Sequence, residues 1–294
     1  MKNTVSLSII TLTKNRAGLL EKCLGSLCGQ LSALDEIIII DNCSKDNTKT
    51  VIQKYSNKFI IHAFESKLVG YPNLYNFAVS KSSNTLLVFL DDDCVVTKSY
   101  IHQIREWYST KTGFVLQGKT KSLPRKNILA ELSEDHLDNW IDSNMYNDHN
   151  LTIIDNRNTI IPITIFNEVG GFSPTMKVGS EDVELGMRMV GAGIPIYFDP
   201  LLVAYHNERT SLKSFLLQHM RIANSHAVLD KTLTRTQKIS MFNKHTWKRH
   251  MQSFINREAI YFHEKRYIDA LYLPIIYILL GLVRIVGYLR APKI

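Results

Sequence analysis

Three consecutive carboxylates, Asp91, Asp92 and Asp93, directly follow the apolar run TLLVFL, and Asp41 follows four consecutive isoleucines. Short apolar runs of this kind are typical of strands buried on both faces of a parallel sheet, and ligands bind such sheets where the strands end. Neighbouring carboxylates repel one another unless a cation neutralises them. Their oxygens suit Mg²⁺ or Mn²⁺, which commonly bridge to substrate phosphates. The pattern therefore predicts a divalent metal, Mn²⁺ or Mg²⁺, at this edge, with acidic helix caps as the alternative.

Two further acids, Glu181 and Asp182, open a segment with helical periodicity. They are either acids favoured by the dipole of a helix N-terminus or a general base on the rim of the pocket, and the spacing alone leaves both interpretations open. His206 follows a later apolar segment. A lone histidine is more often structural than a ligand, but this one could return to the same edge and complete a metal shell of oxygen and nitrogen atoms.

The elements that must position these residues follow from the hydrophobic periodicity. Apolar runs alternate with helical patterns over the first 90 residues, which predicts βαβ units and a parallel α/β sheet. The predicted strands are 5–11, 36–40, 59–63, 85–90, 113–118, 194–199 and 203–206. The predicted helices are 19–27, 48–55, 73–80, 99–108 and 181–190, followed by helical structure after residue 211. Residues 127–150 are polar, acidic and aromatic, without a clear period.

Composition excludes several protein classes. Hydrophobic residues are 45% and charged residues 21% of the 294, the mix of a globular chain rather than a disordered one. The four cysteines are sparse and lack C-x-x-C spacing, which disfavours a disulfide framework or a zinc site and indicates a reducing compartment. No small-residue cleavage site follows the first apolar run, so we expect no signal peptide.

Six motifs together resemble the family 2 glycosyltransferases, which are inverting enzymes with a GT-A fold. The motifs are SIITLTKNR, IIIIDNCSKDNT, VFLDDD, EVGGF, SEDVELGMRM and the later YH, and they span residues 5–208 in the order of the family. The resemblance implies a Rossmann-like, mostly parallel sheet flanked by helices. We therefore expect a GT-A catalytic domain over 1–210 and a basic helical C-terminal region over 211–294.

The resemblance also implies a role for each matching residue. Asp182 would be the catalytic base, with Glu181 beside it. Asp93 would bind the metal, and His206 would complete the metal site. The other matching residues would surround the nucleotide, its ribose or the water shell of the metal. These donor-binding residues are Thr13, Asn15, Arg16, Asp41, Asn76, Asp91 and Asp92.

The implied reaction is the transfer of a sugar from a nucleotide-sugar, UDP- or dTDP-linked, to a glycan or lipid-linked acceptor, as in cell-surface polysaccharide synthesis. Departures from the family pattern at Lys14 and at 163–166 leave the donor open. One alternative is a sugar nucleotidyltransferase, although 11–16 lacks the glycine-rich phosphate loop of that class. Another is a non-enzymatic nucleic-acid-binding protein that uses a basic tail, but the tail ends in a long apolar run.

The net charge of +8 is concentrated near the C-terminus. Residues 231–266 hold nine basic and two acidic residues, which predicts contact with an anionic surface, either phospholipid or nucleic acid, with a solvated basic face as the alternative. Residues 270–289 are mostly apolar, but their uncharged part, 270–283, is shorter than the roughly 20 residues that span a bilayer. We therefore expect a cytoplasmic enzyme that is peripheral on the inner face of the membrane. We expect no nucleic-acid partner. The alternative for 270–289 is a helix packed on the catalytic domain or on a second subunit of a homodimer.

Overall fold

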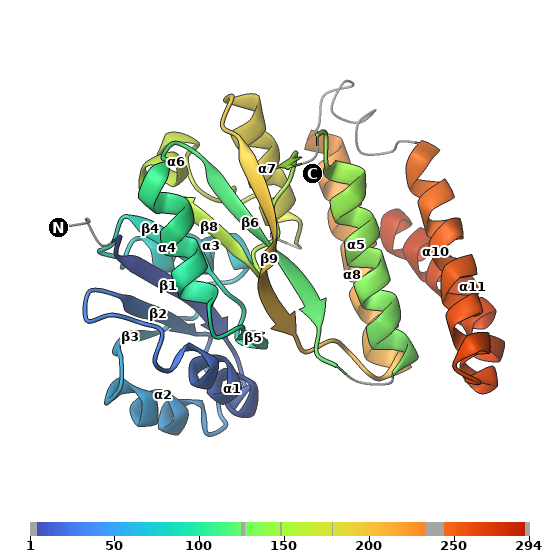
Figure 1. Ribbon diagram of the computed structural model, residues 1–294, viewed down its shortest axis with the longest axis horizontal. Coiled ribbons are helices and arrows are strands. Elements are labelled where there is room, and N and C mark those ends of the chain that lie inside the picture. Colours follow the sequence, from blue (N-terminus) through green and yellow to red (C-terminus); the bar gives the residue numbers. More distant parts are fainter. Residues whose placement is uncertain (1–4, 125–126, 148, 178, 233–243, 292–294) are drawn as a thin grey trace. The chain divides into compact units, whose positions relative to one another are not determined.

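The structure, a computed structural model, describes residues 5–124, 127–147, 149–177, 179–232 and 244–291 (Figure 1). The chain divides into two compact units. The sheet unit comprises Met1–Lys121, Tyr146–Lys177 and Glu181–Asn207. The helical unit comprises Ser122–Met145, Val178–Ser180 and Glu208–Ile294. The domain boundary expected at residue 210 remains a prediction, and the segment Ser122–Met145 belongs with the C-terminal helices in the observed division.

The described strands form one nine-stranded sheet in the order β3-β2-β1-β4-β8-β6-β9-β5, with β7 paired to β9. The sheet is parallel from β3 to β4, and the β4–β8, β6–β8, β5–β9 and β7–β9 pairs are antiparallel. This mixed sheet confirms the α/β class. The strands are β1 Leu7–Thr13, β2 Glu36–Asp41, β3 Ile60–Glu65, β4 Leu86–Phe89, β5 Cys94–Val96, β6 Val115–Ser122, β7 Asn150–Leu151, β8 Thr159–Pro162 and β9 Ile196–His206.

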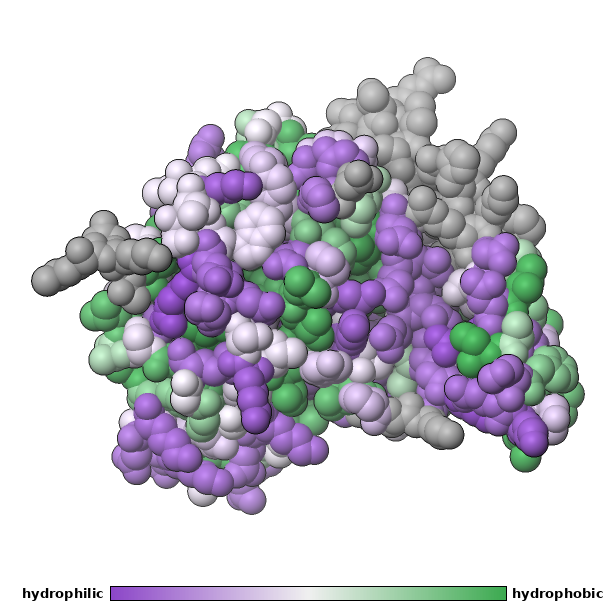
Figure 2. Space-filling model, in the orientation of Figure 1, coloured by the Kyte–Doolittle hydropathy of each residue, from purple (hydrophilic) through white to green (hydrophobic). Residues whose placement is uncertain are grey.

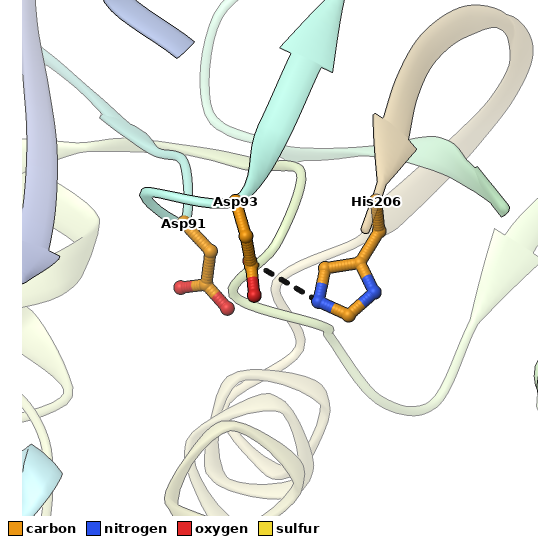
Figure 3. Close-up of side chains that lie close together, drawn as sticks. All are labelled: Asp91, Asp93 and His206. Atoms are coloured by element: carbon orange, nitrogen blue, oxygen red, sulfur yellow. Dashed lines mark ion pairs between the residues drawn. The ribbon is translucent and has the colours of Figure 1, made fainter. Parts of the chain in front are cut away.

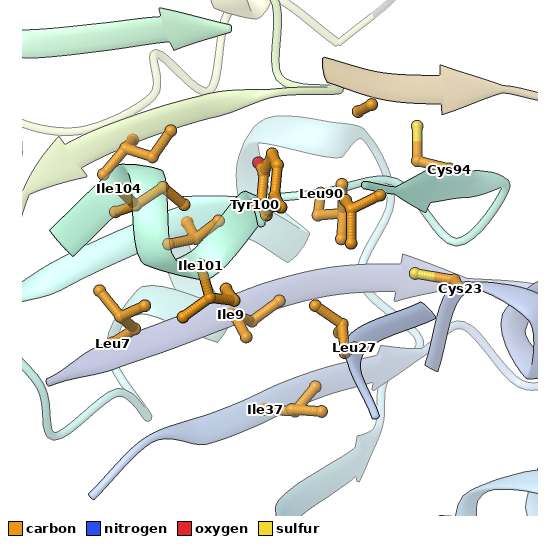
Figure 4. Close-up of a cluster of buried hydrophobic side chains, with 14 of the residues drawn as sticks. Leu7, Ile9, Cys23, Leu27, Ile37, Leu90, Cys94, Tyr100, Ile101 and Ile104 are labelled. Carbon is orange, nitrogen blue, oxygen red and sulfur yellow. The ribbon is translucent and has the colours of Figure 1, made fainter. Parts of the chain in front are cut away.

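Helices cover both faces of the parallel half of the sheet. They are α1 Ala17–Leu27, α2 Thr48–Ser56, α3 Tyr71–Val79, α4 Tyr100–Thr110, α6 Ile163–Glu168 and α7 Glu181–Gly191. Because side chains alternate along a strand, Ile37 and Val88 face a core shared with α1, α2 and α4 (Figure 4). Phe89 points to the other face, where its ring lies 5.5 Å from Tyr75 of α3. Burial on both faces explains why β2 is an uninterrupted isoleucine run.

The helical unit has its own core. Its helices are α5 Ile128–Asn144, α8 Leu212–Thr232, α10 Lys244–His263 and α11 Tyr267–Leu289. Side chains from all four helices meet there, and the largest fully buried ones are Phe215 of α8 and Tyr261 of α10. Apolar side chains also remain at the surface over α10 and α11, where Figure 2 shows green at the right-hand edge.

Ion pairs join α5 to the C-terminal helices. Arg257 Nε donates to Asp135 Oδ2 at 2.9 Å, and Arg266 Nη1 lies 2.8 Å from Glu131 Oε1. The Tyr261 hydroxyl donates to Glu131 Oε2 at 2.6 Å. Two of the nine basic residues of 231–266 are thus neutralised within the protein, which weakens the sequence-based argument from charge. Residues 233–243 of that segment lie outside the described residues.

Residues 127–150, which show no clear period in the sequence, contain the 17-residue helix α5. The Asn127 side chain caps its N-terminus by accepting hydrogen bonds from the amides of Leu129 and Ala130. The buried face consists of Leu129, Ala130, Leu132, Leu137 and Ile141. The apolar period is not evident in the sequence, because polar residues also lie on the packed side of α5. Two of them, Glu131 and Asp135, pair with Arg266 and Arg257.

The two late strands expected at 194–199 and 203–206 are wrong as separate elements, because they form the single strand β9. Asp199 and Pro200 lie within this strand. The predicted helix 181–190 is confirmed as α7, and the helical structure expected after residue 211 is confirmed for the described residues.

Candidate active site

Acidic side chains gather where the parallel strands of the sheet unit end. Asp41 is the last residue of β2, and Asp91 to Asp93 lie between β4 and β5. β1 separates β2 from β4, so the strand order brings the Thr13, Asp41 and Asp91 segments to the same edge. The sequence-based placement of these acids at one edge is confirmed by this topology.

Asp91, Asp93 and His206 form a compact group at this edge (Figure 3). One ligand atom from each residue lies within 4.8 Å of the other two. His206 reaches the group because β9 pairs with β5, which places Cys94 opposite His206 in register. His206 Nε2 lies 3.1 Å from Asp93 Oδ1. Two carboxylates and an imidazole are ligands that suit a divalent metal ion.

Asp92 is not part of this group and pairs with Arg16. Arg16 Nη1 lies 2.6 Å from Asp92 Oδ1, while Arg16 Nη2 lies 2.8 Å from Asp93 Oδ2. Asp92 Oδ2 is buried and has no hydrogen-bond partner in the described part of the chain. The Arg16 guanidinium therefore bridges Asp92 and Asp93 and offsets part of the repulsion between the neighbouring carboxylates.

The acids differ in their pKa values. Burial, followed by the charge of Asp93, raises the pKa of Asp91 to about 7. Burial also raises the pKa of Asp92 to about 6, although Arg16 opposes this shift. For Asp93 burial acts in the same direction, but His206, Arg16 and Arg157 outweigh it and lower the pKa to about 2. Asp91 thus stays partly protonated near neutrality, and a further cation beside it would favour its ionised form.

Asp182 lies in the first turn of α7 and faces the segment before β8. The amide of Val183 donates to Asp182 Oδ1 at 2.8 Å. Burial, followed by the charge of Asp155, raises the pKa of Asp182 to about 6. Gly186 lets α7 approach this segment, because an added Cβ would lie 2.7 Å from the Ile154 amide nitrogen.

Arg157 is a site residue that the sequence reasoning missed. Its Nε donates to both carboxylate oxygens of Asp155, at 2.9 and 3.1 Å. Its charge also acts to lower the pKa of Asp91, Asp93 and Asp182, so Asp182 and the group of Asp91, Asp93 and His206 share one cationic neighbour. The acid and arginine in a polar segment before the apolar run 160–163 were the available signal.

Asn158 and Gln117 hold the segment that carries Arg157. Asn158 Nδ2 donates to the Leu202 carbonyl at 2.8 Å, and the Asp155 amide donates to Gln117 Oε1 at 2.7 Å. Both side chains are fully buried. The loop is therefore fixed by the sheet beneath it and not by contacts at its tip.

The remaining predicted donor-binding residues occupy defined local contacts. Asp41 Oδ1 accepts from the Ser44 amide at 2.8 Å, and Asn15 Oδ1 accepts from the Lys45 amide at 2.7 Å. Asn76 Nδ2 donates to the Phe172 carbonyl at 2.8 Å, so its amide supports the chain before α7. Glu181 is buried, and its charge acts on Tyr75, whose hydroxyl lies 3.1 Å from Asp91 Oδ1.

The sequence profile of a known family, described as glycosyl transferase family 2, matches residues 8–178. The chain is a family 2 glycosyltransferase. This match covers more than half of the chain and confirms the family and the enzyme class expected from the motifs. The motif SEDVELGMRM and His206 lie beyond the matched residues.

Named relatives of this glycosyltransferase are distant. Validoxylamine A glucosyltransferase of Streptomyces hygroscopicus subsp. jinggangensis is 27% identical over 221 residues, which cover 65% of this chain and 52% of the relative. Chondroitin synthase of Pasteurella multocida is 25% identical over 71% of this chain and 25% of its own length. The chain thus spans about half the length, or less, of these curated relatives.

Solved structures show the same fold. A mannosyltransferase from Pyrobaculum calidifontis, in complex with GDP-Man and Mn²⁺, has a TM-score of 0.66 at 14% identity. It covers 97% of this chain, which in turn covers 87% of it. S. aureus TarS 1–349 in complex with UDP-GlcNAc has a TM-score of 0.55 at 16% identity, with coverage of 97% and 89%. These likenesses confirm the GT-A fold of the glycosyltransferase.

Proposed function

We propose that this glycosyltransferase transfers a sugar from a UDP- or dTDP-linked donor to a hydroxyl of a glycan or lipid-linked acceptor, with inversion at the anomeric carbon. The observation that carries this proposal is the group of Asp91, Asp93 and His206 with Asp182 nearby, linked through the charge of Arg157. Relatives and structural neighbours named for glycosyl transfer and for nucleotide-sugar complexes support it.

The residues present fit a divalent cation. Asp91, Asp93 and His206 supply two oxygens and a nitrogen, and the ligand atoms lie within 4.8 Å of one another. We assign Asp93, His206 and Asp91 as the residues that would hold Mn²⁺ or Mg²⁺. Bound there, the cation would stabilise the departing nucleoside diphosphate as a Lewis acid. The Mn²⁺ in the mannosyltransferase structure supports Mn²⁺ as the first ion to test.

The donor nucleotide is assigned to the loops that follow β1 and β2. Asp41, buried at the end of β2, would accept a hydrogen bond from the pyrimidine ring. Asn15 and Arg16, with Thr13 before them, line the neighbouring loop, and Arg16 already contacts Asp92 and Asp93. Its guanidinium can release a carboxylate and bind a diphosphate oxygen instead. Both groups offer anionic oxygens that accept hydrogen bonds from its paired N–H donors.

Asp182 is assigned as the general base. Its carboxylate would take the proton of the acceptor hydroxyl while that oxygen forms a bond to the anomeric carbon. The bond from this carbon to the diphosphate oxygen breaks in the same step, so the configuration inverts. A pKa of about 6 leaves Asp182 mostly ionised at neutral pH and still basic enough to accept a proton. Glu181 is assigned a supporting place beside it.

The donor and metal are tested by a screen of nucleotide-sugar hydrolysis with the full-length protein. We expect slow release of UDP or dTDP from the matching sugar nucleotides with Mn²⁺ or Mg²⁺, and none with EDTA. The physical reason is that leaving-group charge on the diphosphate is unstabilised without a cation. A preference for GDP-linked sugars would contradict the role of Asp41. Full activity in EDTA would contradict the metal.

The membrane proposal rests on α11. In the described part of the chain, this helix is long and apolar enough to cross a membrane, with 23 residues, a mean hydropathy of 2.1 and 28% of its apolar window buried. Its length exceeds the uncharged segment 270–283, so the sequence argument from length alone does not exclude a span. Its exposed residues recur at spacings of three and four: Ile268, Leu271, Ile275, Ile278, Leu282, Ile285 and Leu289.

We nevertheless infer a peripheral position for α11. One side packs along α8, an amphipathic helix with polar residues such as His219 and Asp230, so lipid cannot surround α11. The opposite apolar stripe would lie in the interface of the inner membrane leaflet, where Tyr267 and Tyr288 near its ends suit the headgroup region. A membrane position would place the enzyme near a lipid-linked acceptor.

Charges placed on this stripe test the membrane proposal. We expect the double variant Ile278→Asp, Leu282→Asp to lose most binding to anionic vesicles, because the two side chains are 65% and 56% exposed and would enter the lipid. Leu201→Asp in the sheet unit, at a side chain 72% exposed, is the matched control and should bind normally. Co-sedimentation measures the difference. Equal binding of all three proteins would contradict the proposal, and carbonate-resistant binding would indicate a span.

A further inference from the structure

A charged and only partly exposed residue, Arg284, lies beside the core of the helical unit. The inward face of α11 carries the buried residues Ala270, Leu273, Ile276, Leu280 and Gly287, and the partly buried Tyr277 and Arg284 continue its spacings of three and four residues. Such spacing forms the seam of two helices packed along each other. Arg284 is thus placed between Leu280 and Gly287 on the side of α11 that packs on α8.

Close packing of α8 and α11 directs Arg284 toward α8. A Cβ at Gly287 would lie 2.4 Å from the Met220 carbonyl oxygen, so the two backbones meet one turn beyond Arg284. Arg284 Nη2 lies 3.3 Å from Nδ1 of His219, which is only 5% exposed. The His136 ring of α5 lies 5.1 Å from the His219 ring, so α5 also packs against the histidine that Arg284 contacts.

Arg284 has no anionic partner among the described residues. Its only hydrogen bond there is the one to His219, although a guanidinium carries five N–H donors. Burial, followed by the charge of Arg284, lowers the pKa of His219 to about 3, with Glu208 opposing the shift, and the same two causes lower that of His226 to about 4. Both imidazoles are therefore neutral and cannot offset a second charge. An enclosed cation without a counter-charge is costly unless a ligand supplies one.

A polar residue in a helix seam can instead serve to fix the register of the two helices. A single asparagine or glutamine suffices for that purpose, and it leaves fewer unmet donors than arginine. The surrounding histidines also differ from the leucines that seal an ordinary seam. His219 and His226 are seven residues apart on α8, so both lie on the same side of this helix as Arg284.

We propose that Arg284, His219 and His226 form a binding site for a phosphoryl group within the helical unit. The guanidinium fork matches two phosphate oxygens, and the neutral imidazoles can donate further hydrogen bonds without adding charge. The group could belong to a soluble phosphate ester or to a lipid headgroup, since the apolar stripe of α11 lies on the opposite side of the same helix. The proposal uses none of Asp91, Asp93 and His206, and it does not rest on the proposed reaction.

The test uses the full-length protein and inorganic phosphate in EDTA, so that no metal–phosphate complex can form at the acids of the sheet unit. Binding is measured by calorimetry and by the imidazole nitrogen signals of His219 and His226. We expect saturable binding that weakens by about tenfold or more in Arg284→Gln, the loss of a charge-assisted hydrogen-bonded pair. Arg290→Gln, an exposed arginine six residues further along the chain, is the matched control and should bind as the unaltered protein does.

Vesicles distinguish the two sources of the phosphoryl group. Arg284-dependent binding to vesicles with a phosphomonoester lipid, but not to phosphatidylcholine vesicles, would assign a lipid headgroup, and binding of inorganic phosphate alone would assign a soluble ligand. Phosphate affinity that is equal in Arg284→Gln and Arg290→Gln would overturn the site. If Arg284→Gln does not fold, the unaltered protein still decides, because unchanged His219 and His226 signals on phosphate addition would also overturn it.

Discussion

Asp93→Asn is expected to lower kcat/KM for sugar transfer by about 10³-fold, since stabilisation of leaving-group charge by a bound cation is worth several kcal/mol. Asp93 is the member of the proposed metal site with the lowest pKa, so it is the carboxylate that is fully ionised at neutral pH. It is also the acid that contacts His206 and Arg16 together. Loss of its charge would remove the strongest anionic ligand of the group.

Asp92→Asn is the contrasting variant for this prediction. Asp92 is adjacent in the chain and equally buried, but it pairs with Arg16 and lies outside the group of three ligands. We expect it to retain Mn²⁺ binding, measured by electron paramagnetic resonance, while Asp93→Asn loses it. Thermal unfolding of both variants controls for the lost ion pairs. If Asp93→Asn binds Mn²⁺ and retains activity, the metal assignment is wrong.

The sequence predicts which acids lie at the ends of the parallel strands better than it predicts which other side chains contact them. Asp41 and Asp91 to Asp93 could be placed together because fully buried strands must be apolar, and each such run ends at an abrupt polar residue. For His206, the sequence indicated only that it could lie at the same edge of the sheet as these acids. Its approach to Asp93 depends on the pairing of β5 with β9, which joins segments more than 100 residues apart.

The sequence pattern did not identify residues whose charge acts on groups that are distant along the chain. Arg157 contacts Asp155 two residues away and also influences acids on two other segments, and nothing in the local pattern reveals these neighbours. The same reason explains the basic segment 231–266. Arg257 and Arg266 resemble solvent-exposed charges in the sequence, but the carboxylates of α5 neutralise them from more than 100 residues away.

Arg284 shows a further limit of the sequence. A single charge in an apolar run suggests the end of a membrane helix or a residue at its edge. The spacing of three and four residues places it in a seam only when the partner helix is known, and α8 supplies that information through Gly287 and Met220.

Asp182→Asn is expected to lower kcat by 10²- to 10⁴-fold while leaving the affinity for the donor nucleotide nearly unchanged, because a positioned base contributes this much and does not contact the nucleotide. The pH profile gives a second measurement. Because burial raises the pKa of Asp182 to about 6, and the ionised form is the active one, kcat/KM should fall about tenfold per pH unit below pH 6. Asp182→Asn should lack this acidic limb.

Glu181→Gln is the matched control, since Glu181 is the neighbouring buried acid in the same helical turn. We expect it to keep the acidic limb and to lose less activity than Asp182→Asn. The configuration of the product, determined from the coupling of its anomeric proton, should be opposite to that of the donor. A product that retains the donor configuration would rule out direct deprotonation and displacement. If Glu181→Gln loses the limb and Asp182→Asn keeps it, the base is Glu181 and our assignment is wrong.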